Sequence, residues 1–193
     1  MKPLAASGVA SSAPVTMSEM AGVRIEPWSE DDLPLLERLL GDPAMMSHLG
    51  GPESRAKIAE RHARYVEYAA DEPQFRVVDS ATGEPAGWVG YWQRRWRDGD
   101  VYEIGWSVLP QFQGRGVATA ATGQAIGHAA AARRRRFMHA FPASANGPSN
   151  AICRKLGFTF LEECRFEYPP GRFMSCNDWR LDLRGASDPE EPR

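Results

Sequence analysis

The sequence from Gly105 to Ala121 reads Gly-Trp-Ser-Val-Leu-Pro-Gln-Phe-Gln-Gly-Arg-Gly-Val-Ala-Thr-Ala-Ala. Its first residues favour a strand, Pro110 ends that strand, and two glycines lead into small residues that favour a helix. The first amides of a helix have no acceptor within it, and glycines let a phosphate approach the backbone. The stretch therefore predicts either a pyrophosphate site at the amides of residues 113–118 or an ordinary strand-to-helix turn. It is neither a Gly-x-Gly-x-x-Gly fingerprint nor a phosphate loop.

Length and composition indicate a single globular domain. The 193 residues carry a formal charge of −2, which provides no overall basic field for nucleic acid or an anionic membrane. The three cysteines form no Cys-x-x-Cys pair, so we expect neither a metal site nor a disulfide framework, and we expect a reducing cytoplasm. We predict a flexible leader over residues 1–20, a domain over 21–184 and a disordered tail over 185–193.

Hydrophobic spacing and turn residues outline the elements of this domain. Strands are predicted at 23–28, 75–79, 86–96, 101–108, 137–141, 158–168 and 173–183, and helices at 29–40, 52–70, 117–132 and 146–155. The second, third and fourth strands form an antiparallel meander. The fifth strand is expected to run parallel to the fourth, because a helix crosses between them.

The fourth strand alternates in a way that separates two kinds of side chain. Tyr102, Ile104, Trp106 and Val108 point one way, whereas Glu103 lies on the sparsely filled face, which it shares with Gly105 and Ser107. A carboxylate beside the presumed anion-binding loop is either a general base or a solvent-facing strand residue.

Three other patterns have a structural and a functional interpretation. Trp88, Trp92 and Trp96 share one side of a strand, as core filling or as a substrate wall. His62 falls on an apolar helix face, which favours a packed, structural histidine. The basic run 133–136 suits a solvated helix C-terminus better than an anion site.

Two motifs in this order resemble a known family. Residues 103–110, followed by Gln-x-x-Gly-x-Gly-x-Ala at 111–118, are similar to the acetyl-CoA-binding motif of the GNAT superfamily of N-acetyltransferases. Asn146-x-x-Ser149 and Lys155-Leu-Gly-Phe158 resemble the branch that includes the ribosomal-protein N-terminal acetyltransferases. The resemblance covers about residues 23–183.

The resemblance implies an α/β (α+β) fold with a mostly antiparallel sheet of about seven strands, helices on both faces, and a splayed parallel pair at strands four and five. It also implies acetyl-CoA as the acyl-donor co-substrate, whose pantetheine arm would add to the splayed strands. The expected cofactor-binding residues are Ser107, Val108, Leu109, Gln113, Gly114, Arg115, Gly116, Val117, Ala118, Asn146 and Ser149.

For catalysis, the resemblance implies Glu103 as general base and Ser149 as a donor toward the departing thiolate, with water as the alternative proton source. Many superfamily members have a tyrosine general acid two residues before the lysine that matches Lys155, but this chain has Cys153 there. That role is therefore not transferred, and we expect Cys153 to be buried and inert.

We expect the acceptor to be a protein or peptide N-terminus or a small α-amine, in a pocket shaped by the three tryptophans and residues 44–51. The alternatives are an acetyltransferase for antibiotics or polyamines, and a non-catalytic acyl-CoA sensor or scaffold. A nucleotide-binding protein is disfavoured, because this sequence has neither a metal-holding acid nor a phosphate-loop lysine. We expect a monomer or a homodimer, with no nucleic-acid or membrane partner.

Overall fold

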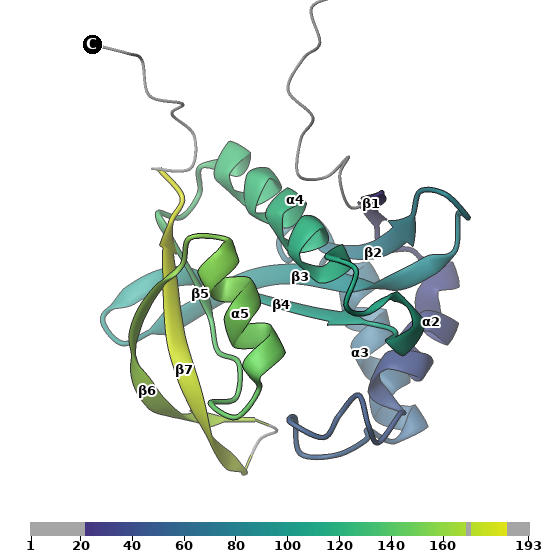
Figure 1. Ribbon diagram of the computed structural model, residues 1–193, viewed down its shortest axis with the longest axis horizontal. Coiled ribbons are helices and arrows are strands. Elements are labelled where there is room, and N and C mark those ends of the chain that lie inside the picture. Colours follow the sequence, from purple (N-terminus) through teal and green to yellow (C-terminus); the bar gives the residue numbers. More distant parts are fainter. Residues whose placement is uncertain (1–21, 169–170, 185–193) are drawn as a thin grey trace, which may run out of the picture.

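The computed structural model describes residues 22–168 and 171–184. The predicted leader and tail lie outside the described residues. A seven-stranded sheet has the order β1-β2-β3-β4-β5-β7-β6, and its only parallel neighbours in the described chain are β4 and β5 (Figure 1). The strands are β1 (Val23–Pro27), β2 (Gln74–Asp79), β3 (Pro85–Trp96), β4 (Gly99–Val108), β5 (Phe137–Ala140), β6 (Thr159–Glu167) and β7 (Phe173–Asp182).

The helices are η1 (Glu30–Asp32), α2 (Leu33–Leu40), α3 (Arg55–Glu67), η2 (Pro110–Phe112), α4 (Val117–Ala132) and α5 (Gly147–Lys155). The helix expected over 29–40 is divided, because a capping box between Ser29 and Asp32 closes a 3-10 turn first. The helix expected over 52–70 is shorter, since the Ser54 side chain caps it by accepting from the Lys57 amide.

Helices cover both faces of the sheet. Tyr91 on β3 hydrogen-bonds His128 of α4 at 2.7 Å from one face. On the opposite face, the ring of Trp88 stacks on Tyr65 of α3 at 5.7 Å between centroids. The inner side of α4 consists of small residues, and Ala121, Ala125 and Ala129 are all but inaccessible to solvent. Small side chains allow α4 to pack close to the strands (Figure 1).

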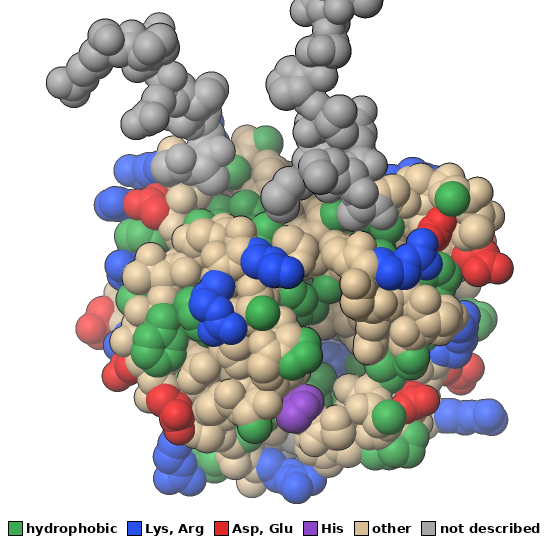
Figure 2. Space-filling view, viewed as in Figure 1, with side chains coloured by type: hydrophobic (Ala, Val, Ile, Leu, Met, Phe, Trp, Pro, Cys, Tyr) green, Lys and Arg blue, Asp and Glu red, His purple; other side chains and the backbone are tan. Residues whose placement is uncertain are grey.

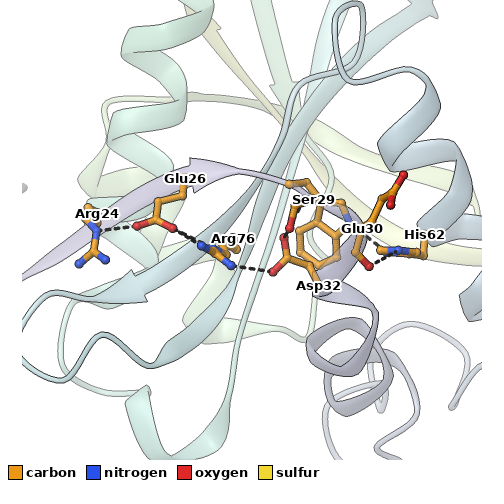
Figure 3. Close-up of polar contacts among 8 residues, drawn as sticks. Arg24, Glu26, Ser29, Glu30, Asp32, His62 and Arg76 are labelled. Carbon is orange, nitrogen blue, oxygen red and sulfur yellow. Dashed lines mark hydrogen bonds and ion pairs between the residues drawn. The ribbon is translucent and has the colours of Figure 1, made fainter.

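The histidine on α3 is structural, as its sequence context indicated. Its Nδ1 accepts a hydrogen bond from Trp28 Nε1 at 3.1 Å, and its Nε2 lies 3.1 Å from the Glu30 carbonyl oxygen. Figure 3 shows His62 in this position beside a chain of polar contacts, in which Arg76 bridges Glu26 and Asp32. These contacts fasten α3 and β2 to the segment after β1.

The parallel pair is short, as expected for splayed strands. Only Tyr102↔Met138 and Glu103↔His139 are in register between β4 and β5, whereas β4 continues to pair with β3 as far as Val108↔Gly87. The edge of β4 that faces β5 is therefore without a partner strand beyond Glu103. Backbone groups on an open edge can pair with an extended ligand.

Candidate active site

A cleft with a volume of about 760 Å³ opens where β4 and β5 separate. Figure 2 shows a hollow near the centre of this face, bordered in part by hydrophobic side chains. Most of the residues predicted for the site line this one cleft. They are Glu103, Ser107, Val108, Gln113, Gly114, Gly116, Val117, Ala118, Asn146 and Ser149.

The loop before α4 has the geometry of an anion site. Gly114 and Gly116 adopt positive φ angles of 72° and 80°, a conformation that glycine tolerates best. The Gln113 amide, which was expected in the anion site, donates instead to the Pro110 carbonyl at 3.2 Å. Within the described chain, the amides of residues 114–119 donate no hydrogen bond, and Ala120 N–H is the first to bond within this turn, to the Gly116 carbonyl at 3.0 Å. No atom lies within 4 Å of a Cβ built on either glycine, so the space in front of these amides is open. Free amides, open space and a helix N-terminus fit a pyrophosphate.

Alternate residues of β4 turn their backbone groups toward the open edge. Leu109 N–H donates to the Ala86 carbonyl at 2.8 Å, which directs its backbone toward β3. Since strand groups alternate in direction, the backbone of Val108 faces the gap, and Gln113 Nε2 donates to the Val108 carbonyl at 2.8 Å. Leu109 is buried in the core and lies outside the cleft lining, in contrast to its expected cofactor contact.

Arg115 is the other predicted residue that does not line the cleft. Its exposed guanidinium lies 3.4 Å from the Asp79 carboxylate and above the ring of Phe112. A salt bridge at the surface therefore accounts for this side chain. Only the backbone amide of Arg115 remains in the anion loop.

Glu103 is buried, with a side-chain exposure of 12%. The solvent-facing alternative for this residue is therefore wrong. Its Oε2 accepts a hydrogen bond from Arg94 Nη1 at 2.5 Å, and Trp92 is its direct neighbour across the β3–β4 pair. Burial raises the pKa of Glu103 above its ordinary value, while the charge and hydrogen bond of Arg94 oppose that rise.

The N-terminus of α5 is held by two asparagines. Asn146 Oδ1 accepts from the Ser149 amide at 3.1 Å, so the predicted Asn146 is the N-cap of the helix that presents Ser149 to the cleft. Asn150, which the sequence analysis missed, is buried. Its amide donates to the Ala143 and Asn146 carbonyls, and its Oδ1 accepts from Asn177 and Trp179. The signal that could have identified Asn150 was a polar residue on the inner face of the helix predicted over 146–155.

Cys153 occupies the buried side of α5. Its exposed fraction is 0%, it does not line the cleft, and burial raises the pKa of its thiol to about 12. A neutral thiol directed into the core is inert, as expected from the sequence.

The other end of the cleft is lined largely by aromatic side chains. Trp88 and Trp92 line it, whereas Trp96 packs against Phe141 and Phe166 and donates to Asp178. The predicted tryptophan row is thus part wall and part core. Further lining residues that the sequence analysis did not assign to the site are Tyr65, Arg61, Phe141, Phe166, Tyr168 and Met174.

Comparison with known proteins gives a family and a fold. Residues 23–159 match the family model described as "Acetyltransferase (GNAT) domain". No curated protein is similar enough to match the chain. Among the described residues, no helix is long and apolar enough to cross a membrane, and no three His, Cys, Asp or Glu side chains gather as metal ligands.

Solved structures share the fold at low sequence identity. Spermidine N-acetyltransferase from Vibrio cholerae, in complex with CoA and spermine, has a TM-score of 0.71 at 17% identity, over 85% of this chain and 97% of that one. The ribosomal L7/L12 α-N-protein acetyltransferase RimL, in complex with coenzyme A, has a TM-score of 0.70 at 19% identity, over 88% and 96%. The ribosomal-protein-S5-alanine acetyltransferase from Vibrio fischeri has 0.70 at 17%, over 89% and 96%.

Proposed function

The chain belongs to the GNAT acetyltransferase family, and from that premise we propose that it transfers the acetyl group of acetyl-CoA to a primary amine by direct attack. The observation that carries the proposal is the shared cleft. Free amides at the N-terminus of α4, an open edge of β4 and a buried carboxylate at Glu103 all face it.

Acetyl-CoA would supply an activated acetyl thioester. The amides of residues 114–119 are suited to bind its pyrophosphate, because they donate no hydrogen bond within the described chain and flank two glycines that have open space around them. The edge of β4 from Ile104 to Val108 is suited to pair with the pantetheine arm. Solved relatives whose descriptions name bound CoA support this assignment.

Glu103 acts as the base that takes the proton of the attacking amine. Arg94 holds one carboxylate oxygen, which fixes the direction of the group at the point where the strands separate. A carboxylate with a raised pKa is a better proton acceptor than an exposed one. Ser149 stands on the other side of the cleft as the donor for the departing thiolate.

The acceptor is an α-amine rather than a lysine side chain. An α-amino group titrates at about 8 and a lysine amine at about 10.4, so the former is partly neutral at pH 7 and needs less from a single carboxylate base. A protein N-terminus or a small α-amine both satisfy this chemistry. The motifs at Asn146 and Lys155 favour the N-terminal acetyltransferase branch.

An amine panel with thiol release as readout tests the proposal. It contains α-amines, Nα-blocked lysine, a polyamine and an aminoglycoside at equal concentration near pH 7. We expect α-amines to be acetylated at least as well as lysine. Activity on the polyamine or aminoglycoside alone would overturn the α-amine assignment and leave an acetyltransferase. Binding of acetyl-CoA without turnover of any amine would instead identify an acyl-CoA sensor or scaffold.

A further inference from the structure

The cleft beyond Glu103 has a floor of stacked rings, which we call the aromatic floor: Tyr65, Trp88 and Trp92. The rings of Tyr65 and Trp88 are inclined by 3° with centroids 5.7 Å apart, and those of Trp88 and Trp92 by 20° at 6.5 Å. Trp88 thus has a ring contact with each of the other two residues. The floor is joined by the apolar side chains of Phe141, Phe166 and Met174 on the facing wall.

Gly105 leaves room for the two indoles over the sheet, and Gly90 leaves room for the side chain of Gln74. Gly90 and Gly105 are directly opposite in the β3–β4 register. A Cβ on Gly105 would lie 3.2 Å from the Cη2 atoms of both Trp88 and Trp92, so the six-membered edges of the indoles converge over this residue. Gln74 Oε1 accepts from Trp88 Nε1 at 3.0 Å and fixes that ring. The floor is therefore built before any acceptor arrives.

Ring edges carry the positive part of the aromatic quadrupole, and ring faces carry the negative part. The edges that converge over Gly105 offer little to a cation, and as part of the cleft lining the two indoles favour an aromatic or apolar body. On the facing wall, ring faces that could bind a cation are already in use, since the guanidinium of Arg94 lies 4.4 Å from the Phe166 centroid and near Phe141 and Trp96.

The carboxylates at this end of the cleft already pair with arginine side chains of the protein. Glu103 is the only acidic residue in the described lining, and it is paired with Arg94. Behind the lining, Glu53 accepts from Arg61 Nη2 at 2.5 Å and from the hydroxyl of Tyr168 at 3.3 Å. A second ammonium on the acceptor would be buried without a counter-charge, which is costly.

We propose that the acceptor is a monoamine whose amino group is attached to an aromatic or bulky apolar body that lies against the aromatic floor, and that Trp88 determines this specificity. The inference rests on the proposed acetyl transfer and narrows its acceptor. A free arylalkylamine and a peptide that begins with an aromatic residue present the same aromatic body and differ in the basicity of the amine, which is close to that of lysine in the former and to that of an α-amine in the latter.

The test compares kcat/KM for matched acceptors near pH 7 with the unmodified protein: 2-phenylethylamine, n-butylamine, 1,4-diaminobutane, and the dipeptide amides Phe-Gly and Ala-Gly. We expect 2-phenylethylamine to exceed 1,4-diaminobutane by at least about 10-fold, and Phe-Gly amide to exceed Ala-Gly amide, because apolar pockets discriminate by about this much. Whichever aromatic acceptor is the better substrate identifies the source of the amine, small molecule or peptide.

Trp88→Leu supplies the second arm. It keeps an apolar side chain, and Trp88 is farther along β3 from Glu103 than Trp92 is. We expect the ratio of 2-phenylethylamine to n-butylamine to fall by about 2- to 12-fold, as the loss of one aromatic contact implies. The reference is Phe160→Leu, an exposed aromatic residue of β6 outside the cleft lining, which should leave the ratio unchanged.

Faster turnover of 1,4-diaminobutane than of 2-phenylethylamine would overturn this inference and leave the acetyltransferase in place. An unchanged ratio in Trp88→Leu, with an unchanged shift of the melting temperature by acetyl-CoA, would overturn the role of Trp88. If the protein binds acetyl-CoA but acetylates none of the amines, the proposed function fails and this inference fails with it.

Discussion

The two ends of the cleft are lined by different kinds of group, backbone at one end and side chains at the other. At the end formed by the α4 loop and the open edge of β4, the groups that face the cleft are largely backbone amides and carbonyls. At the end formed by the aromatic floor, they are side chains from α3, β3, β6 and β7. Glu103 lies on the border, because β4 runs through both ends.

This difference suggests that one end of the cleft serves the co-substrate shared by the family and the other serves the acceptor of this chain. Backbone groups recognise a ligand that a whole family shares, since their positions depend on a loop conformation and a strand register. Side chains from distant segments can vary without disturbing that framework, so we propose that the acceptor is selected at the aromatic end. We therefore expect substitutions to fall into two classes, those that affect acetyl-CoA and those that affect the amine.

The largest effect is expected at the border between the two ends. Glu103→Gln should lower kcat by about 10²- to 10⁴-fold at neutral pH, and by less at high pH where the amine is already neutral. Acetyl-CoA affinity should barely change. The matched control is Glu60→Gln on the exposed side of α3, which should retain full activity. Equal loss at every pH, or loss of acetyl-CoA binding, would make Glu103 a structural residue.

The next effect concerns the backbone end. Gly116→Val forces a β-branched residue to a φ of 80°, which strains the loop and displaces its amides. We expect acetyl-CoA binding to weaken by at least about 10-fold and the acetyl-CoA-induced rise in melting temperature to disappear. Gly114→Val, at a φ of 72°, should behave in the same way.

Gly127→Ala on the same helix is the control for these glycine variants. Its Cβ would meet no atom within 4 Å, and alanine favours a helix over glycine by about 1 kcal/mol, so the fold should become slightly more stable. If Gly114→Val and Gly116→Val still bind acetyl-CoA normally, the phosphates lie elsewhere.

A smaller, pH-dependent effect is expected from Arg94→Met. Arg94 lowers the pKa of Glu103 against the effect of burial, so its removal should raise that pKa further. The base must be ionised, and the acidic limb of the kcat/KM profile should move to higher pH. Arg94→Lys should move it less. Arg95→Met, whose exposed side chain pairs with Asp100, is the control.

Stability should follow the same titration. The folded-state pKa of Glu103 lies above its unfolded value, so the contribution of the protonated carboxyl is fully present below the unfolded pKa and is lost as pH rises through the folded pKa. In Arg94→Met the unpaired carboxylate makes this loss larger. A melting temperature that rises over this pH range would contradict the assignment.

The smallest effect is expected on the core side of α5. Cys153→Ala should leave kcat within about two-fold while lowering stability by about 1 kcal/mol, because the thiol is buried away from the cleft. Thermal unfolding and steady-state rates measured on one preparation separate the two effects. A large fall in kcat without loss of stability would instead indicate that Cys153 takes part in proton transfer.

The backbone end was predictable from the sequence because its signals are local. Pro110, the two glycines and the following small residues encode the loop and the start of α4, and the crossing helix encodes the parallel pair. The bounds expected for α4, residues 117–132, are those observed. Leu109 lies outside the cleft lining, because the sequence does not show which of residues 107–109 turn their backbone to the gap.

The aromatic end was only partly predictable. The even spacing of the tryptophans placed Trp88 and Trp92 on one face, but not the ring of Tyr65 stacked on them from α3. Arg94 lies on the same face of β3 as Trp92, which pairs with Glu103. The register set by the hairpin at 98–99 could therefore have indicated Arg94 as the partner of Glu103. The contact of Arg61 with Tyr168 joins segments far apart in the chain and has no local signature.

A calorimetric titration of acetyl-CoA into the unmodified protein, Gly116→Val and Trp88→Leu tests the division between the two ends most directly. We expect one binding site in the unmodified protein, affinity reduced by at least about 10-fold in Gly116→Val, and affinity unchanged in Trp88→Leu. Absence of binding to the unmodified protein, or equal weakening in both variants, would contradict it.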